Sequence, residues 1–300
     1  MKPITIFTPA YNRAHLLPRL YESLKKQTSQ DFIWLVVDDG SADDTRQLMN
    51  SYITEGILDI QYIFQENQGM HGAHNTAYEN IKTELNTCID SDDFMPDDAV
   101  EIILNKWKTI STEDKLKYSG IVGLDADMNG RIIGSKFTTE TTTLEDFYLN
   151  GGSGDKKLVY RTEVMNKYPP YPLFQGEKYV GLGYKYLLAD QEYQLITINE
   201  VLIIVDYQEG GSSNNMFRQY YKNPKGFSFI RKHAMVLSKS RKRRFQEAVH
   251  YVSSNLIIRN GKFIQESPKK LLTILALPGG ILLYAVIKYK NRKQIKTKEL

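Results

Sequence analysis

Clustered carboxylates follow two apolar segments in the first hundred residues. Asp38 and Asp39 come directly after the apolar stretch 32–37, and the segment Asp90-Ser91-Asp92-Asp93 comes directly after Ile89. Three carboxylates within four positions favour a divalent cation, and their hard oxygen ligands suit Mg²⁺ or Mn²⁺, which can neutralise a departing diphosphate. A solvated acidic loop is the alternative for the later segment, and a turn that caps the next helix is the alternative for the earlier pair.

The elements that must position these acids alternate between apolar and amphipathic stretches. Repeated strand and helix units predict an α/β fold with a mostly parallel sheet and helices on both of its faces. Because ligands bind beyond the carboxyl ends of such strands, we expect both groups of acids at that edge. The expected strands are Ile4–Thr8, Phe32–Val37, Ile60–Phe64, Thr87–Ile89, Gly120–Leu124 and Gln194–Val205, and the expected helices include Thr45–Tyr52, Leu144–Leu149, Gly226–Leu237 and Arg243–Ile258.

The composition is that of a folded, enzyme-sized protein in a reducing compartment. The chain has 300 residues, 41% of them hydrophobic and 25% charged, and Cys88 is its only cysteine. One cysteine excludes an internal disulfide framework, and the strand-like N-terminus gives no leader for secretion, so we expect a cytoplasmic protein. The net charge of +4 is concentrated near the C-terminus. No aromatic-rich recognition motif accompanies it, so we expect no nucleic-acid partner.

An apolar segment without any charged residue spans residues 271–287. Lysines precede it and a basic tail follows it, which suits the anionic cytoplasmic surface of a cell membrane. Its length is marginal for a spanning helix, and Pro278-Gly279-Gly280 is expected to break it. We therefore predict an interfacial or hairpin-like insertion at the inner face of the membrane. A buried pair of core helices is the alternative.

Four motifs together resemble a known enzyme family. In chain order they are Thr8-Pro9-Ala10-Tyr11-Asn12-Arg13, Asp38-Asp39-Gly40-Ser41, Asn67-Gln68-Gly69 with His71 and Asn75, and Asp90-Ser91-Asp92-Asp93. In this order and spacing they resemble the family 2 glycosyltransferases of the GT-A fold, over about residues 1–125. Three later segments are similar to a bacterial branch that makes polysaccharides and other cell-surface glycans: Gly176-Glu177-Lys178-Tyr179, Ile198-Asn199-Glu200 and Glu209-Gly210-Gly211-Ser212.

The resemblance implies that the first two motifs hold the nucleotide. The backbone near Pro9 and the ring of Tyr11 would hold the uracil or other base. Asp39 would accept a hydrogen bond from that base, and Asp38 would support the same pocket.

The third motif is similar to the part of the family that lines the donor's phosphate and sugar. Asn67, Gly69, His71 and Asn75 would take this role here. Many relatives have Lys or Arg where this chain has Met70, so a direct phosphate contact at that position is not implied. A buried or helix-capping histidine is the alternative for His71.

The fourth motif matches the metal-binding acids of the family. Asp90 would contact the ribose, Ser91 would belong to the nucleotide-sugar site, and Asp92 would ligate Mn²⁺ or Mg²⁺. Asp93 would be an alternative ligand of that ion or would lie in its outer coordination shell.

The catalytic base is implied by position only. Family members supply it from a Glu-Asp pair downstream of the metal motif, and this chain has Glu177-Lys178 in the nearest position. An inverting transfer needs a carboxylate to take the proton of the acceptor hydroxyl. We therefore predict Glu177 as the base and Asp190 as the second candidate. A surface carboxylate in a salt bridge is the alternative for either residue.

These motifs predict inverting transfer of a sugar from a nucleotide-sugar, UDP being favoured by the family, to a glycan or lipid-linked acceptor. No Gly-rich loop follows the first strand, which argues against a nucleotidyltransferase or a dinucleotide-dependent oxidoreductase. The non-enzymatic alternative is a membrane-associated scaffold that binds nucleotide-sugar without transferring it. We predict a GT-A domain over 1–215, with a nucleotide-binding half 1–125 and an acceptor half 126–215, and a helical basic extension over 216–300.

Overall fold

The computed structural model describes residues 2–207 and 216–298, with side chains described as far as Arg292. The segment Glu209-Gly210-Gly211-Ser212, which resembles a bacterial branch of the family, lies outside the described residues. The domain boundary predicted at residue 215 lies outside them as well.

Contacts within the chain divide it into two compact units. The first consists of Met1–Pro170 and Ala189–Gln208, and the second of Tyr171–Leu188 and Glu209–Leu300. Residues 171–188 belong to the predicted acceptor half by sequence, but by their contacts they group with the C-terminal helices.

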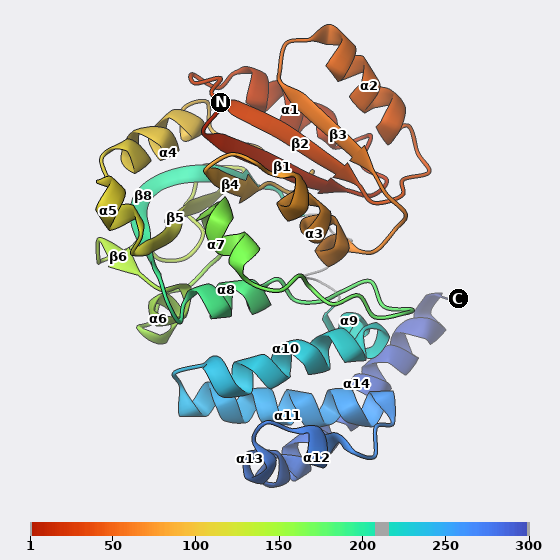
Figure 1. The fold of residues 1–300 in the computed structure, drawn as a ribbon. Coiled ribbons are helices and arrows are strands. Elements are labelled where there is room, and N and C mark those ends of the chain that lie inside the picture. Colours follow the sequence, from red (N-terminus) through yellow and green to blue (C-terminus); the bar gives the residue numbers. More distant parts are fainter. Residues whose placement is uncertain (1, 208–215, 299–300) are drawn as a thin grey trace. The chain divides into compact units, whose positions relative to one another are not determined.

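The first unit is built on one sheet of eight strands (Figure 1). The strand order is β3-β2-β1-β4-β7-β5-β8-β6. The first four strands in this order pair in parallel, as do β5 and β8, whereas β7 and β6 are antiparallel to their neighbours. The predicted mostly parallel α/β sheet is confirmed, although the sequence pattern predicts neither β6 nor β7. The strands are β1 Ile4–Ala10, β2 Phe32–Asp38, β3 Ile60–Phe64, β4 Leu85–Cys88, β5 Tyr118–Asp127, β6 Thr141–Thr142, β7 Lys156–Arg161 and β8 Gln194–Val205.

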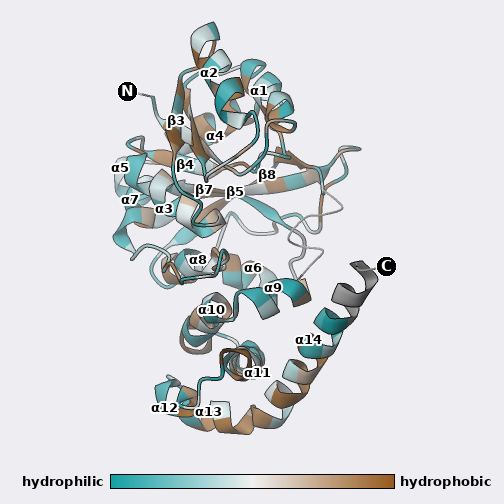
Figure 2. Cartoon of the chain, turned by 90° about the vertical axis from the view of Figure 1, so that its right-hand side faces the viewer, coloured by the Kyte–Doolittle hydropathy of each residue, from teal (hydrophilic) through white to brown (hydrophobic). Residues whose placement is uncertain are grey.

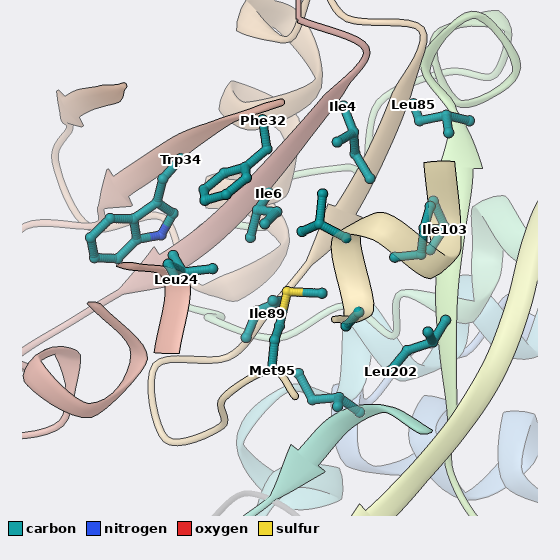
Figure 3. Packing of buried hydrophobic residues seen from close by; sticks show 14 of the residues in the cluster. Ile4, Ile6, Leu24, Phe32, Trp34, Leu85, Ile89, Met95, Ile103 and Leu202 are labelled. Atoms are coloured by element: carbon teal, nitrogen blue, oxygen red, sulfur yellow. The ribbon is translucent and has the colours of Figure 1, made fainter. Parts of the chain in front are cut away.

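Helices cover both faces of this sheet. Alternate residues of β1 point to opposite faces, so Ile4 and Ile6 join the core under α1, α2 and α4, whereas Phe7 contacts His74 of α3. Figure 3 shows the first of these clusters, with Trp34 of β2 among its largest buried side chains. Burial of each such side chain contributes about 1.5–3 kcal/mol, which holds the strands in register. The helices of this unit are α1 Leu17–Lys25, α2 Thr45–Glu55, α3 Met70–Asn80, α4 Ala99–Lys108, α5 Thr112–Lys115, α6 Leu144–Leu149 and α7 Thr162–Lys167.

The second unit has a hydrophobic core of its own. α10 and α11 lie side by side, and α14 packs against α11 (Figure 1). The buried hydrophobic residues of this core are Met235, Ala248, Tyr251, Val252, Phe263 and Ala276. The helices are α8 Gly183–Ala189, α9 Met216–Lys222, α10 Pro224–Leu237, α11 Arg241–Ile258, α12 Phe263–Glu266, α13 Lys270–Leu275 and α14 Leu277–Lys298.

The apolar segment 271–287 is divided between α13 and α14, and its break lies earlier than predicted. α13 ends at Leu275, and α14 runs from Leu277 through Pro278-Gly279-Gly280 without interruption. The break predicted at Pro278 is wrong because proline is tolerated in the first turn of a helix, where its missing N–H has no helical partner. Among the residues with described structure, no helix is both long enough and apolar enough to cross a membrane.

Candidate active site

The carboxyl ends of β1, β2 and β4 lie at one edge of the sheet because these strands are parallel. Backbone hydrogen bonds between neighbouring strands continue just beyond the ends of β2 and β4. The N–H of Asp39 donates to the carbonyl of Ala10 over 2.8 Å, and the N–H of Ile89 donates to the carbonyl of Phe7 over 2.9 Å. The two groups of acids thus lie at the same edge, where open α/β sheets bind ligands, as expected.

Asp38 is fully buried and bonded within the protein. Its carboxylate accepts a hydrogen bond from the N–H of Ser41 at 2.8 Å and one from the hydroxyl of Tyr62 at 2.5 Å. The Asp38 carboxylate joins the turn after β2 to β3, which fits the predicted supporting role.

Asp39 organises the loop that leads into α3. One carboxylate oxygen accepts from the side-chain amide of Gln65 and from the N–H of Gln68, and the other accepts from the N–H of Gly69, each at 2.7 Å. Its carboxylate therefore positions the loop predicted to line the phosphate and sugar. The predicted bond from Asp39 to the base stays a prediction.

The loops after β1 and β2 are joined by hydrogen bonds. Asn12 has a positive φ of 55°, its N–H donates to the hydroxyl of Ser41, and its side-chain oxygen accepts from the N–H of Ala42, both at 2.8 Å. Pro9 lies in β1 and is partly buried, whereas the ring of Tyr11 is 50% exposed at the start of the loop. An exposed ring on a braced loop is available to stack on a base.

Of the four residues predicted to line the phosphate and sugar, Asn67 and Gly69 directly precede α3, and His71 and Asn75 lie within it. Gly69 is the N-cap residue with a φ of 84°. A Cβ on Gly40 would lie 2.9 Å from the backbone nitrogen of Asn67, so only glycine allows these two loops to approach. Asn75 is partly buried, but His71 is 1% exposed, which favours the buried alternative for that histidine.

The acids after β4 form a compact oxygen cluster. Side-chain oxygens of Asp90, Asp92 and Asp93 lie within 4.8 Å of one another, and Ser91 between them is buried. Burial raises the pKa of Asp93 to about 7. Carboxylates this close repel one another unless a cation or proton intervenes, and hard oxygen ligands in this number fit Mn²⁺ or Mg²⁺.

Hydrogen bonds from residues distant in sequence hold the acid cluster in place. Arg19 of α1 donates to the backbone carbonyl of Asp92 and pairs with Asp206 at 2.8 Å. The N–H of Asp206, directly after β8, donates to the carboxylate of Asp93 at 3.1 Å. No motif of the sequence indicates Arg19 or Asp206, because the partners are separated by up to 187 residues.

A lysine that the sequence analysis missed lies among the acids. Lys157 of β7 is 9% exposed, and its ammonium group donates to the backbone carbonyl of Cys88 at the end of β4. Burial raises the pKa values of Asp93 and Asp125, and the positive charge of Lys157 opposes that rise. The same charge attracts Asp90. The adjacent pair Lys156-Lys157 before an apolar run was the only signal for it in the sequence.

Asp125 is a further buried carboxylate near the carboxyl end of β5. The residue is 5% exposed, and its Oδ1 has no hydrogen-bond partner among the described residues. Burial raises the pKa of Asp125 to about 6. A carboxylate with a pKa in this range can accept a proton at neutral pH.

The two predicted bases both accept hydrogen bonds from backbone N–H groups in the first turn of a helix. Glu177, in the second unit, accepts from two such groups of α10 at 2.9 and 2.8 Å. Asp190, in the first unit, accepts from two groups of α6 at 3.2 and 2.8 Å. Carboxylates in this position stabilise a helix by about 1 kcal/mol. Each residue thus has a part in folding, and its part in catalysis stays a prediction.

The residues that form this sheet edge match a known protein family. Residues 5–114 match the family model described as glycosyl transferase family 2. This part of the chain belongs to that family. The resemblance indicated by the four motifs is confirmed, and the glycosyltransferase segment contains β1 to β4 with both groups of acids.

Curated relatives of this chain include proteins named as glycosyltransferases, the enzyme class predicted from the sequence. Chondroitin synthase from Escherichia coli is 34% identical over 105 residues, which cover 35% of this chain and 15% of that protein. Teichoic acid poly(glycerol phosphate) polymerase from Staphylococcus epidermidis is 33% identical over 108 residues, which cover 36% of this chain and 15% of that protein. The match thus spans about a seventh of the length of these relatives.

Two solved structures share the fold over nearly the whole chain. S. aureus TarS in complex with UDP-GlcNAc superposes with a TM-score of 0.63 at 19% identity, covering 97% of this chain and 92% of that one. The mannosyltransferase PcManGT from Pyrobaculum calidifontis, in complex with GDP-Man and Mn²⁺, gives 0.54 at 17% identity, covering 95% and 75%. Likeness at this identity shows the fold alone, and the predicted GT-A fold is confirmed.

Proposed function

We propose that this chain is an inverting glycosyltransferase that moves a sugar from a nucleotide-sugar, with UDP as the favoured nucleotide, to an acceptor hydroxyl. The observation that carries the proposal is the acid cluster at the carboxyl end of β4, on the same sheet edge as Tyr11 and Asp39. A nucleotide-sugar needs one group of residues for its base and another for its diphosphate. The fold neighbours in complex with UDP-GlcNAc and with GDP-Man and Mn²⁺ support a nucleotide-sugar as the donor.

Asp92 and Asp93 are the residues that would hold a divalent ion, with Asp90 beside them. When bound, Mn²⁺ or Mg²⁺ supplies positive charge that stabilises the departing diphosphate. Arg19 holds the backbone of the acidic loop, and Lys157 adds a fixed positive charge next to it. Such preorganised charge stabilises a leaving group without rearrangement during the reaction.

The donor's base would stack on the exposed ring of Tyr11, and its phosphates and sugar would face the loop organised by Asp39. The residues proposed to contact or support the donor are Pro9, Tyr11, Asp38, Asp39, Asn67, Gly69, His71, Asn75, Asp90 and Ser91.

One carboxylate must take the proton of the acceptor hydroxyl. Glu177 is the first candidate, from its position in the family pattern, and Asp190 is the second. Asp125 joins them because its Oδ1 has no hydrogen-bond partner in the described part of the chain and its pKa is raised to about 6 by burial.

The acceptor we propose is a hydroxyl of a cell-surface polysaccharide or a lipid-linked glycan at the inner face of the cell membrane. Two of the matched relatives are named as a chondroitin synthase and a teichoic acid polymerase, which supports a polymer of this kind.

A protein that binds nucleotide-sugar without transferring it is the second candidate function. The observation in its favour is that Glu177 and Asp190 both accept hydrogen bonds from helix N-termini. A carboxylate used in this way has part of its acceptor capacity occupied.

Calorimetric titration of UDP and GDP into the full chain, with and without Mn²⁺, tests the proposal. We expect Mn²⁺-dependent binding of one nucleotide, lost in Asp92→Ala and retained in Asp97→Ala, which removes an exposed acid of the same segment. Release of that nucleotide from its sugar conjugates then distinguishes transfer from binding alone. A folded protein that binds neither nucleotide would overturn both candidate functions.

A further inference from the structure

Large apolar side chains are exposed on α13 and on the part of α14 up to Tyr289. Each of them is more than a third exposed, and Leu271, Leu282 and Tyr289 are about 70% exposed. Figure 2 shows these two helices mostly in the colour of hydrophobic residues up to the basic second half of α14. We call this set the outer face: Leu271, Ile274, Leu275, Ile281, Leu282, Val286 and Tyr289.

The opposite side of the same helices packs inside the second unit. Thr273 and Ile287 are buried there. A Cβ on Gly280 would lie 2.4 Å from the Cβ of Val252, so glycine lets α14 approach the backbone of α11 closely. Apolar residues therefore lie on both sides of these helices, one set packed in the core of the unit and the other exposed. Exposed large apolar side chains gathered on neighbouring helices in this way are typical of a docking site.

The charges around the outer face indicate what covers it. No acidic residue lies between Glu266 and Glu299, whereas Lys269 and Lys270 precede the outer face and Lys288, Lys290 and Arg292 lie around Tyr289 at its end. A bilayer with anionic headgroups offers acyl chains to the apolar side chains and negative charge to the flanking lysines. Tyr289, between two lysines, has the amphipathic ring that is enriched at the headgroup level.

The arrangement favours a helix pair that lies in the membrane surface. The part of α14 from Leu277 to Tyr289 is about 20 Å long at 1.5 Å per residue, and its inner side is already occupied by α11. Only the outer face can therefore enter the lipid. Helices with one apolar face and basic flanks bind at the boundary between headgroups and acyl chains.

We propose that the outer face of α13 and α14 docks on the surface of a bilayer that contains anionic lipid, with its leucines among the acyl chains and the flanking lysines at the lipid phosphates. This proposal names the residues that would contact the membrane. It rests on the proposed function only in placing the acceptor at a membrane. Binding to lipid requires no sugar transfer, so the two can fail separately.

Co-sedimentation of the full chain with vesicles tests the proposal. We expect binding to phosphatidylglycerol and phosphatidylcholine mixtures, weaker binding to phosphatidylcholine alone, and a decrease as salt is raised. Leu275→Glu and Leu282→Glu should each weaken binding about tenfold or more, since each removes a leucine from lipid and adds a charge of the wrong sign. Lys269→Ala with Lys270→Ala should weaken binding only to the anionic vesicles. Ile53→Glu, at a comparably exposed position of α2, should bind as the unmodified chain does.

Three results would overturn the proposal. The first is unchanged vesicle binding by both leucine variants, and the second is an equal loss in Ile53→Glu. The third is a dimer in sedimentation velocity that Leu282→Glu dissociates while the unmodified chain fails to bind vesicles, since the outer face would then join two copies of the chain. Nucleotide titration of the same variants separates this outcome from a failure of the proposed function, because Leu282→Glu should bind nucleotide as before.

Discussion

The ammonium group of Lys157 donates a hydrogen bond to the backbone carbonyl of Cys88, across 69 residues of sequence. Cys88 is the last residue of β4, and Asp90 follows it by two positions. The bond therefore fixes a positive charge at the base of the acid cluster, where the charge attracts Asp90, Asp93 and Asp125. Any divalent ion held by these acids is repelled by Lys157, so this lysine limits the affinity of the site for metal.

Replacing Lys157 with methionine should tighten Mn²⁺ binding. Removal of one positive charge near the ion favours the metal by roughly 1 kcal/mol, or about fivefold in affinity, at an effective dielectric constant near the surface value. Calorimetry above pH 7 measures the effect, because Asp93, with its pKa of about 7, is then mostly ionised.

Lys157→Arg is the matched control, since it keeps the charge and should leave the Mn²⁺ affinity within about twofold. A lysine that only supported the strand would give the opposite sign, with weaker metal binding in Lys157→Met. That result would contradict the electrostatic role.

Asp93→Asn should stabilise the metal-free protein above pH 7. Burial raises the pKa of Asp93 from 3.8 to about 7, so the folded state binds this proton more tightly than the unfolded state. Its contribution to stability is full below about pH 4 and is lost as the pH rises through 7. With allowance for partial exposure, the charged carboxylate costs on the order of 1–3 kcal/mol above pH 7. Thermal unfolding in a chelator should give a higher Tm for the variant at about pH 8 and nearly equal values at about pH 4.

Adding Mn²⁺ should reverse this order, since binding to the native state stabilises the unmodified chain and not Asp93→Asn. Asp97→Asn, which changes an exposed acid of the same segment, should show neither effect. A Tm difference that did not change with pH would mean that Asp93 is not the group that titrates.

The sequence indicated the part of the site that follows the parallel strands. Asp39 and Asp92 follow apolar runs within a few positions, and since parallel strands end at the same edge, their place at that edge could be predicted from the sequence. Lys157 could not be predicted in this way. Its strand has only three clearly apolar residues, Leu158-Val159-Tyr160, and it inserts antiparallel between β4 and β5, which no periodicity indicates.

The capping of helices by Glu177 and Asp190 could not be predicted from the sequence for a related reason. Glu177 accepts hydrogen bonds from two N–H groups of α10 that lie 48 and 49 residues later in the sequence. Asp190 accepts from two N–H groups of α6 that lie 46 and 45 residues earlier. Local capping patterns, such as that of Thr143 at α6, involve neighbours three residues apart and can be recognised. The position of the proline in α14 was misjudged because a first-turn proline and a helix-breaking proline differ only in where the helix begins.

Amide substitutions of the three candidate bases should separate catalysis from folding. Removal of a general base lowers transfer by about 10²–10⁴-fold while donor binding persists, and we expect this result for Glu177→Gln. For Asp190→Asn we expect a loss of about 1 kcal/mol of unfolding free energy from the weakened cap of α6, with transfer largely retained. Single-turnover transfer and urea denaturation on the same samples measure both quantities.

The pH dependence of transfer distinguishes the third candidate. If Asp125 were the base, the rate would rise with pH up to its pKa of about 6, and Asp125→Asn would abolish that rise. Retained transfer in Glu177→Gln together with this profile would move the assignment from Glu177 to Asp125.

Gly280→Ala should destabilise the second unit because the new Cβ would lie 2.4 Å from the Cβ of Val252. The strain displaces α14 from α11 and costs about 1–3 kcal/mol, as overpacking of a core usually does. Gly261→Ala is the matched control, since nothing lies within 4 Å of its added Cβ. Hydrogen exchange of α11 and α14 amides should accelerate in the first variant and not in the second. Because the outer face is held in place by this contact, Gly280→Ala should also weaken vesicle binding, whereas equal protection of α14 in both variants would mean that α14 does not pack on α11 at this glycine.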